Sequence, residues 1–328
     1  MTPDRNLRPL VMGTLVVLSL WGITSAQAPQ PARVDRPRLL EDLRVLAADD
    51  MQGRELGTAG GDKARAYVLQ RFRSAGLQPL GTSYEHPFTA TTRTRGGQSA
   101  ERHGVNVVGV INGTAAHNRY IVISAHYDHV GMRRGQVFNG ADDNASGTAA
   151  LFELARYYRA HPPSTSLLFV AFDGEEEGLL GSRAFVRAPP VPVSSLLVDL
   201  NADMIGRDPD NVLFVVGLAR HPALKPFIDR VASRAPVKLR IGHEPPFGRG
   251  EDDWTEDSDQ YAFIEAGIPG LYFGVEDYAH HHQPTDDFET MTYDFYVRSV
   301  ETLIDVIEEF DRGAEALAST RAAATISR

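Results

Sequence analysis

The sequence predicts an α/β fold in which a mostly parallel sheet is covered by helices on both faces. Apolar runs such as YIVISA (120–125) and SLLFVAF (166–172) are continuous, which is typical of strands that are buried on both sides. Helical patterns separate one such run from the next, as in crossovers between parallel strands. The 328 residues are 42% hydrophobic and 23% charged, an ordinary composition for a folded domain.

The expected elements follow one another from about residue 36. Two helices come first, because apolar residues recur there at spacings of three and four. Strands and helices then alternate. Helices are expected at 39–48, 62–75, 144–160, 178–187, 222–234, 257–267 and 294–312, and strands at 120–125, 166–172, 194–200, 211–217 and 270–275.

Two polar stretches interrupt this alternation and are expected to be surface loops. The first is a short connection from Glu85 to Asn106. The second, 244–259, holds six carboxylates among its last nine residues and lies next to a predicted helix. Alternatively, this second stretch lines a cleft, because binding residues often lie on loops.

The ends of the chain are expected to lie outside a single domain at 36–313. Arg5 and Arg8 precede the apolar run LVMGTLVVLSLWGI, and the pattern Ala26-Gln27-Ala28 follows it. This is the order of a cleavable signal peptide, here 1–28, which predicts an exported protein, periplasmic or secreted. A permanent anchor needs about 20 apolar residues, so no stable membrane insertion is expected after cleavage. Residues 29–35 are expected to be a linker, and 314–328 a disordered tail.

The net charge and the absence of cysteine exclude several kinds of partner and ligand. Lys and Arg number 33 against 43 Asp and Glu, giving a net charge of -10, which argues against a nucleic-acid partner. With no cysteine, neither a disulfide nor a thiolate is available. Any bound metal must therefore be held by nitrogen and oxygen ligands.

Imidazoles and carboxylates gather where the predicted strands end. His126 and Asp128 follow the first strand, Glu175 to Glu177 the next, and Asp203 the third. Asp142 and Asp143 stand side by side before a helix, and three histidines at 280–282 follow the last strand. Taken singly, each of these residues could have a purely structural role, as a helix cap or as part of a solvated turn.

Together these residues predict a metal centre, because ligands bind outside the carboxyl ends of strands in such sheets. Crowded carboxylates resist ionisation unless a cation neutralises them. Histidines with several carboxylates suit two divalent ions that share a bridging carboxylate, and zinc is the usual ion for this ligand set.

Five motifs in this order resemble the secreted di-zinc aminopeptidase family: SAHYDHVG, NGADDNASG, FDGEEEGLLGS, LNADMIGR and HHHQPTDD. Relatives include glutamate carboxypeptidase, the transferrin receptor ectodomain and glutaminyl cyclase. The similarity spans about residues 38–312. It implies a zinc-exopeptidase-like three-layer sandwich, with two Zn²⁺ per chain and without the inserted domain that many relatives carry.

The resemblance also implies residue roles. Asp143 would bridge both ions, leaving Asp142 for capping or for support of the ligands. The remaining ligands would be, for one ion, His126 and Asp203 and, for the other, Glu176 and His282.

The catalytic roles come from the same motifs. Glu175 would be the general base, and Asp128 would hold the His126 region in place. Glu177 receives no role, because its position is usually not acidic in the family. A tyrosine that supports the oxyanion in relatives is replaced by His281, with Tyr278 three residues earlier as the other candidate.

The expected activity is zinc-dependent hydrolysis of the N-terminal peptide bond of peptides with a free α-amine. The alternatives are a glutaminyl cyclase-like acyltransferase, a carboxypeptidase or deacylase, and a non-catalytic binding relative. Within the acidic stretch, Asp252 and Asp253 are expected to attract cationic peptide N-termini, unless the stretch is only a solvated loop.

Overall fold

The computed structural model describes residues 32–93, 99–248 and 252–319. The chain divides into two units, Met1–Ala32 and Arg33–Arg328, and the architecture described below belongs to the second. The expected signal peptide at 1–28 lies outside the described residues. Among the helices that are described, none has the length and apolar character needed to cross a membrane.

Eight strands form one mixed sheet in the order β1-β2-β6-β3-β7-β10-β8-β9. Neighbours in the centre, β6 with β3, β3 with β7 and β7 with β10, are parallel, and β8 pairs with β9 in parallel. The strands are β1 (Glu85–Arg93), β2 (Ser99–Ile111), β3 (Ala116–His126), β6 (Thr165–Phe172), β7 (Leu196–Ala202), β8 (Val212–Val216), β9 (Lys238–Ile241) and β10 (Gly270–Gly274). A separate hairpin pairs β4 (Met132–Arg133) with β5 (Gln136–Val137).

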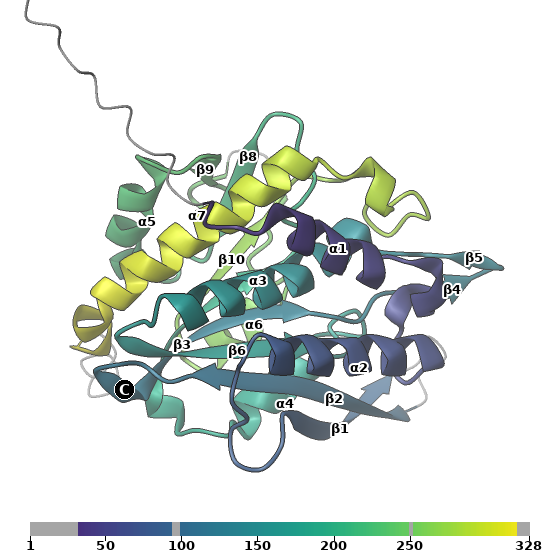
Figure 1. The fold of residues 1–328 in the computed structure, drawn as a ribbon, viewed down its shortest axis with the longest axis horizontal. Coiled ribbons are helices and arrows are strands. Elements are labelled where there is room, and N and C mark those ends of the chain that lie inside the picture. The colour runs from purple at the N-terminus through teal and green to yellow at the C-terminus, as the bar shows by residue number, and fades with distance from the viewer. Residues whose placement is uncertain (1–31, 94–98, 249–251, 320–328) are drawn as a thin grey trace, which may run out of the picture. The chain divides into compact units, whose positions relative to one another are not determined.

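Helices cover both faces of this sheet, as Figure 1 shows. One face carries α1 (Arg36–Leu46), α2 (Ala59–Ser74), α3 (Gly147–Ala160), α5 (Lys225–Ala232) and α7 (Tyr293–Arg312). The other carries α4 (Leu180–Arg187) and α6 (Gln260–Glu265). Short helical turns are η1 (Asp49–Arg54), η2 (Ala141–Ser146), η3 (Val193–Ser195), η4 (Pro222–Leu224) and η5 (Phe288–Thr290). The three-layer α/β fold expected from the sequence is confirmed.

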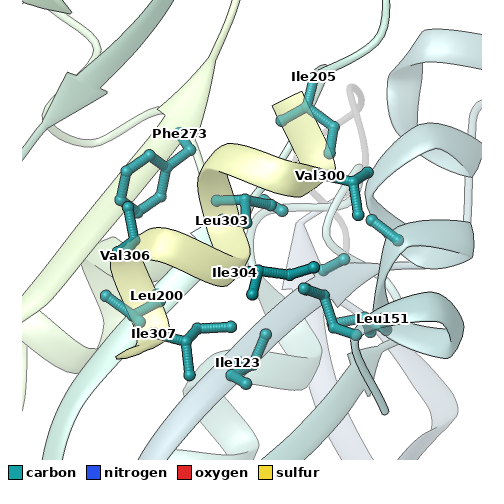
Figure 2. Packing of buried hydrophobic residues seen from close by; sticks show 14 of the residues in the cluster. Ile123, Leu151, Leu200, Ile205, Phe273, Val300, Leu303, Ile304, Val306 and Ile307 are labelled. Atoms are coloured by element: carbon teal, nitrogen blue, oxygen red, sulfur yellow. The ribbon is translucent and has the colours of Figure 1, made fainter. Parts of the chain in front are cut away.

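The two faces of the sheet are packed because alternate residues of each central strand point to opposite sides. In β3, Ile121 and Ile123 join the larger core under α3 and α7, whereas Val122 joins the smaller core under α4 and α6. Figure 2 shows Ile304 and Ile307 of α7 beside Ile123 in the larger core. This packing holds the carboxyl ends of β3, β6 and β7 in fixed positions.

Two expectations were wrong. The stretch from Glu85 to Asn106 contains β1 and much of β2, not a loop. β1 is an edge strand, and residues 99–103 of β2, which pair with it, are mostly exposed and polar, so this part of the sheet has no continuous apolar run. For the tail expected at 314–328, the prediction fails over 314–319, which are helical with Ala314 and Leu317 buried against the larger core, whereas 320–328 lie outside the described residues.

Candidate metal centre

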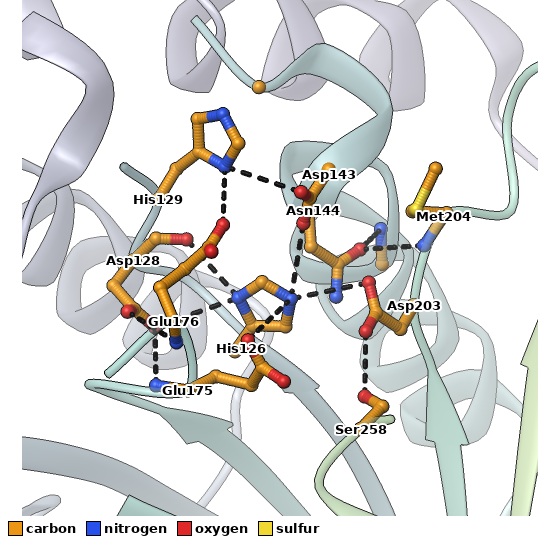
Figure 3. A network of polar contacts seen from close by, with 12 residues as sticks. His126, Asp128, His129, Asp143, Asn144, Glu175, Glu176, Asp203, Met204 and Ser258 are labelled. Carbon is orange, nitrogen blue, oxygen red and sulfur yellow. Dashed lines mark hydrogen bonds and ion pairs between the residues drawn. The ribbon is translucent and has the colours of Figure 1, made fainter. Parts of the chain in front are cut away.

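The predicted ligands meet at one edge of the sheet, where the carboxyl ends of three parallel strands lie together (Figure 3). His126 is the last residue of β3, Glu175 and Glu176 follow β6, and Asp203 follows β7. Asp143 comes from the turn η2 that leads into α3. Strand register thus brings together residues that are far apart in the sequence.

The first cluster consists of His126, Asp143 and Asp203. His126 Nε2 lies 3.2 Å from Asp203 Oδ1 and 3.4 Å from Asp143 Oδ1. The other ring nitrogen, Nδ1, lies 3.2 Å from the carbonyl oxygen of Asp128, to which it can donate. Such a contact fixes the tautomer that leaves Nε2 free to bind a metal. Ser258 donates to Asp203 Oδ2 at 2.6 Å and orients that carboxylate.

The second cluster consists of His129, Asp143, Glu176 and His282. His282 Nε2 lies 2.8 Å from Glu176 Oε2 and 3.2 Å from Asp143 Oδ2. His129 Nδ1 lies 2.7 Å from Glu176 Oε1. The sequence analysis gave His129 no role, although it stands only three residues after His126 in the same motif.

Asp143 is common to both clusters, with Oδ1 facing His126 and Oδ2 facing His282. Its Oδ2 is buried and faces only imidazole nitrogens among the described residues, at 3.2 Å from His282, 3.5 Å from His129 and 3.6 Å from His281. A buried carboxylate oxygen of this kind needs a cation or a donor. The nitrogen and oxygen donor set fits divalent zinc, so the residues present are suited to the implied metal.

Asp142 is turned away from both clusters. Its Oδ1 accepts a hydrogen bond from the backbone N–H of Gly206 at 2.7 Å, which ties η2 to the segment after β7. The backbone N–H groups of Asp142 and Asp143 both donate to Asp286, at 2.9 and 3.0 Å. Asp286 is in turn paired with Arg207 at 2.7 Å. The adjacent aspartates therefore have different structural surroundings.

Asp128 holds the turn that carries the two glutamates. Its carboxylate accepts the backbone N–H of Glu175 at 3.1 Å and that of Glu176 at 3.3 Å. Glu175 Oε2 lies 4.0 Å from His126 Nε2, so this side chain faces the clusters without belonging to either. That is the position a proton-transferring group would need.

Arg54, to which the sequence analysis gave no role, ties together backbone segments that carry the metal centre. Its side chain is fully buried and donates to five backbone carbonyl oxygens, those of Leu46, Tyr127, Asn139, Gly140 and Asp143. The turn that presents it requires Gly53, where φ is +69° and an added Cβ would lie 2.5 Å from the carbonyl oxygens of Gly131 and Phe138.

The electrostatics favour cation binding. Burial, with repulsion from Glu176 and Asp203, raises the pKa of Glu175 well above its ordinary value despite the opposing effect of His126. Burial lowers the pKa of His126, but Asp203 and Glu175 outweigh it and raise that pKa. Hydrogen bonds to Asp143 and Glu176 raise the pKa of His282 to about 10. Without metal, His126 and His282 thus compensate the carboxylates by holding protons.

A cavity of about 400 Å³ opens beside the two clusters. Both oxyanion candidates line it, and His281 Nε2 lies 3.6 Å from Asp143 Oδ2, whereas Tyr278 is 58% exposed. Of the acidic stretch, Glu256 and Asp257 line the cavity, but Asp252 and Asp253 do not. Asp253 instead accepts hydrogen bonds from Thr255.

Comparison with known proteins identifies the family. The sequence pattern of peptidase family M28 matches residues 106–307, and the chain belongs to this family. A probable zinc metalloprotease of Pyrenophora teres f. teres is 28% identical over 237 residues, which cover 65% of this chain and 47% of that protein. Aminopeptidase YwaD of Bacillus subtilis is 36% identical over 91 residues, covering 27% of this chain and 19% of that protein. The chain thus spans about half or less of these relatives.

Solved structures share the fold. A zinc aminopeptidase from Bacillus subtilis superimposes with a TM-score of 0.68 at 17% identity, covering 85% of this chain and 96% of that one. A glutaminyl cyclase from Fimbriiglobus ruber gives 0.66 at 21% identity, covering 84% and 95%. The expected family is thus confirmed by the match to peptidase family M28, and the expected fold is one that zinc aminopeptidases and glutaminyl cyclases share.

Proposed function

We propose that this protein is a di-zinc aminopeptidase that hydrolyses the first peptide bond of peptides with a free α-amine. The observation that carries the proposal is the position of Asp143, which belongs to two ligand clusters at once. His126 and Asp203 would complete one zinc site, and Glu176 and His282 the other. His129 would orient Glu176 by donating from Nδ1 to Oε1, which leaves Oε2 for the metal.

The zinc ions would supply Lewis acidity, which polarises the scissile carbonyl and acidifies water. Glu175 would accept a proton from the attacking water and deliver it to the nitrogen of the leaving amine. The carboxylate of Asp128 accepts the backbone N–H of Glu175 and so holds this residue in place. The carboxyl group of Glu175 is itself largely buried away from solvent. His281 and Tyr278 are the candidates for support of the developing oxyanion, because both line the cavity.

The test compares an aminoacyl amide with its N-acetyl counterpart, each assayed on zinc-loaded and chelator-treated protein. An aminopeptidase cleaves the free amide only, and loses activity with the chelator. A peptide with N-terminal glutamine is included, because a cyclase would release ammonia from it without cutting a peptide bond. Equal cleavage of acetylated and free substrates would contradict the aminopeptidase proposal and favour a deacylase or endopeptidase.

Glu175→Gln provides the mechanistic control. It should retain zinc while the rate of cleavage falls roughly 10²–10⁴-fold, as expected when a positioned acid–base group is removed. Glu176→Gln should by contrast lower the zinc content. The reverse pattern would show that the roles of these adjacent glutamates have been exchanged.

A further inference from the structure

The cavity beside the metal centre combines an apolar wall with an acidic side. The wall is formed by Leu179, Met204, Trp254, Tyr272 and Val275. Besides the residues of the metal centre, the cavity is lined by the carboxylates of Glu256, Asp257 and Asp277. Asp277 is already paired with Arg207. The unpaired carboxylates are therefore those of Glu256 and Asp257.

The apolar wall is held rigidly. Trp254 stacks on His243 with ring centroids 3.5 Å apart and an angle of 4° between the planes. Its edge packs against Phe214 of β8 and its ring tilts against Tyr272 of β10, at 5.8 and 5.9 Å. The backbone N–H of Trp254 donates to the carbonyl oxygen of His243 at 2.8 Å. The sheet thus fixes the segment that carries the two carboxylates.

The acidic side lacks a compensating cation. Within the described part of the chain, no Lys or Arg forms an ion pair with Asp252, Asp253, Glu256 or Asp257; Glu256 accepts only a neutral hydrogen bond, from Tyr261. Burial and repulsion from the neighbouring carboxylates raise the pKa of Asp257, opposed by His281. A cation that enters the cavity would relieve this repulsion.

Resting on the proposed aminopeptidase function, we infer that this cavity receives the side chain of the substrate's N-terminal residue and selects lysine or arginine. The aliphatic stem of such a side chain suits the wall around Trp254, and its cationic head suits Glu256 and Asp257. The same cavity is lined by Asp143, Glu176 and Asp203, so a substrate there lies against the metal centre.

The experiment compares lysine amide with norleucine amide, which has the same stem without the charge. The value of kcat/KM should be about three- to tenfold higher for lysine amide, because two partly exposed ion pairs contribute modestly. Added salt should reduce this preference. In the double variant Glu256→Gln/Asp257→Asn the ratio should fall to about one, while cleavage of norleucine amide stays within about twofold.

The matched control is Glu289→Gln/Asp210→Asn, which removes the same charges from exposed positions that do not line the cavity. It should keep the preference for lysine. If kcat/KM fell equally for both amides in the Glu256/Asp257 variant, the inference would be overturned, because the carboxylates would then act on the α-amine that both substrates share. An unchanged ratio would overturn it as well.

A binding measurement separates this inference from the proposed function. Calorimetry with free lysine and free norleucine on zinc-loaded protein reports the selectivity of the cavity without any catalysis. Tighter binding of lysine by protein that cleaves neither amide would support the cavity's selectivity and refute the aminopeptidase. If the protein cleaves norleucine amide but prefers lysine neither in kcat/KM nor in calorimetry, the selectivity of the cavity is refuted and the aminopeptidase proposal stands.

Discussion

Neighbouring residues of the same type have separate roles in this protein because the backbone turns between them. Asp143 faces both ligand clusters, whereas Asp142 accepts a hydrogen bond from Gly206. The sequence showed that one of the pair could bridge two ions, and the family motif indicated which. It could not show that Asp286 fixes both backbone N–H groups, because that contact joins residues far apart in the chain.

Under the proposed di-zinc function, Asp143→Ala should lose most of both zinc ions, because its carboxylate belongs to both ligand clusters. Asp142→Asn is the control and should retain them. Elemental analysis of the purified variants measures the zinc content directly. Two tightly held ions in Asp143→Ala would show that the carboxylate is not shared.

Arg54→Met should be severely destabilised. It leaves several buried carbonyl oxygens without donors and removes a buried cation whose charge acts on Asp143, Asp286 and Asp128. Loss of one partner from such a buried network costs about 3–5 kcal/mol. Urea unfolding provides the measurement, with Arg44→Met on the exposed side of α1 as the control that changes stability little. Equal stability of the two variants would contradict the supporting role of Arg54.

At the scale of elements, the sequence was most informative where burial is complete. The central strands β3, β6 and β7 were predictable because residues on both of their faces are apolar. The edge strand β1 and the first half of β2, which pairs with it, were missed because their residues are mostly polar or exposed, so no continuous apolar run marks them. His129 was missed for a different reason: its role depends on contact with Glu176, which follows another strand.

The contact between α5 and α7 should weaken in acid. Burial raises the pKa of Glu309 on α7, but hydrogen bonds from Arg230 and Arg312 outweigh it and lower the pKa to about 2. A carboxylate whose pKa is lower in the folded protein stabilises the fold above its ordinary pKa and loses this effect as the pH falls toward the folded value. Stability contributed by Glu309 should therefore decline between about pH 4.5 and pH 2.

The measurement is the urea midpoint of Glu309→Gln against the unchanged protein. The variant should be less stable at pH 7, and the difference should shrink as the pH approaches 2. Glu301→Gln on the same helix is the control, because Glu301 forms no ion pair among the described residues. A difference that is constant with pH would rule out the ion pairs as its cause.

At the scale of the whole molecule, the metal centre joins segments from distant parts of the domain. Its candidate ligands extend from His126 to His282 and come from β3, η2 and the segments after β6, β7 and β10. Because zinc would bind only the folded arrangement, it should raise the thermal midpoint in proportion to the logarithm of its concentration. Differential scanning fluorimetry with stepwise zinc after chelation checks this, and Asp143→Ala should show little response.

The wide separation of these ligands also bears on the order of events in folding. The cluster of His126, Asp143 and Asp203 cannot form until β3 and β7 have paired. The second cluster cannot form until the chain after β10, which carries His282, has returned to the same edge of the sheet. The transition state should therefore precede assembly of the centre, so that zinc slows unfolding and leaves the refolding rate nearly unchanged. Stopped-flow refolding with zinc and with chelator would measure both rates. The protein would then bind its metal only after it has folded. An apoprotein made without zinc would therefore become active when the metal is added.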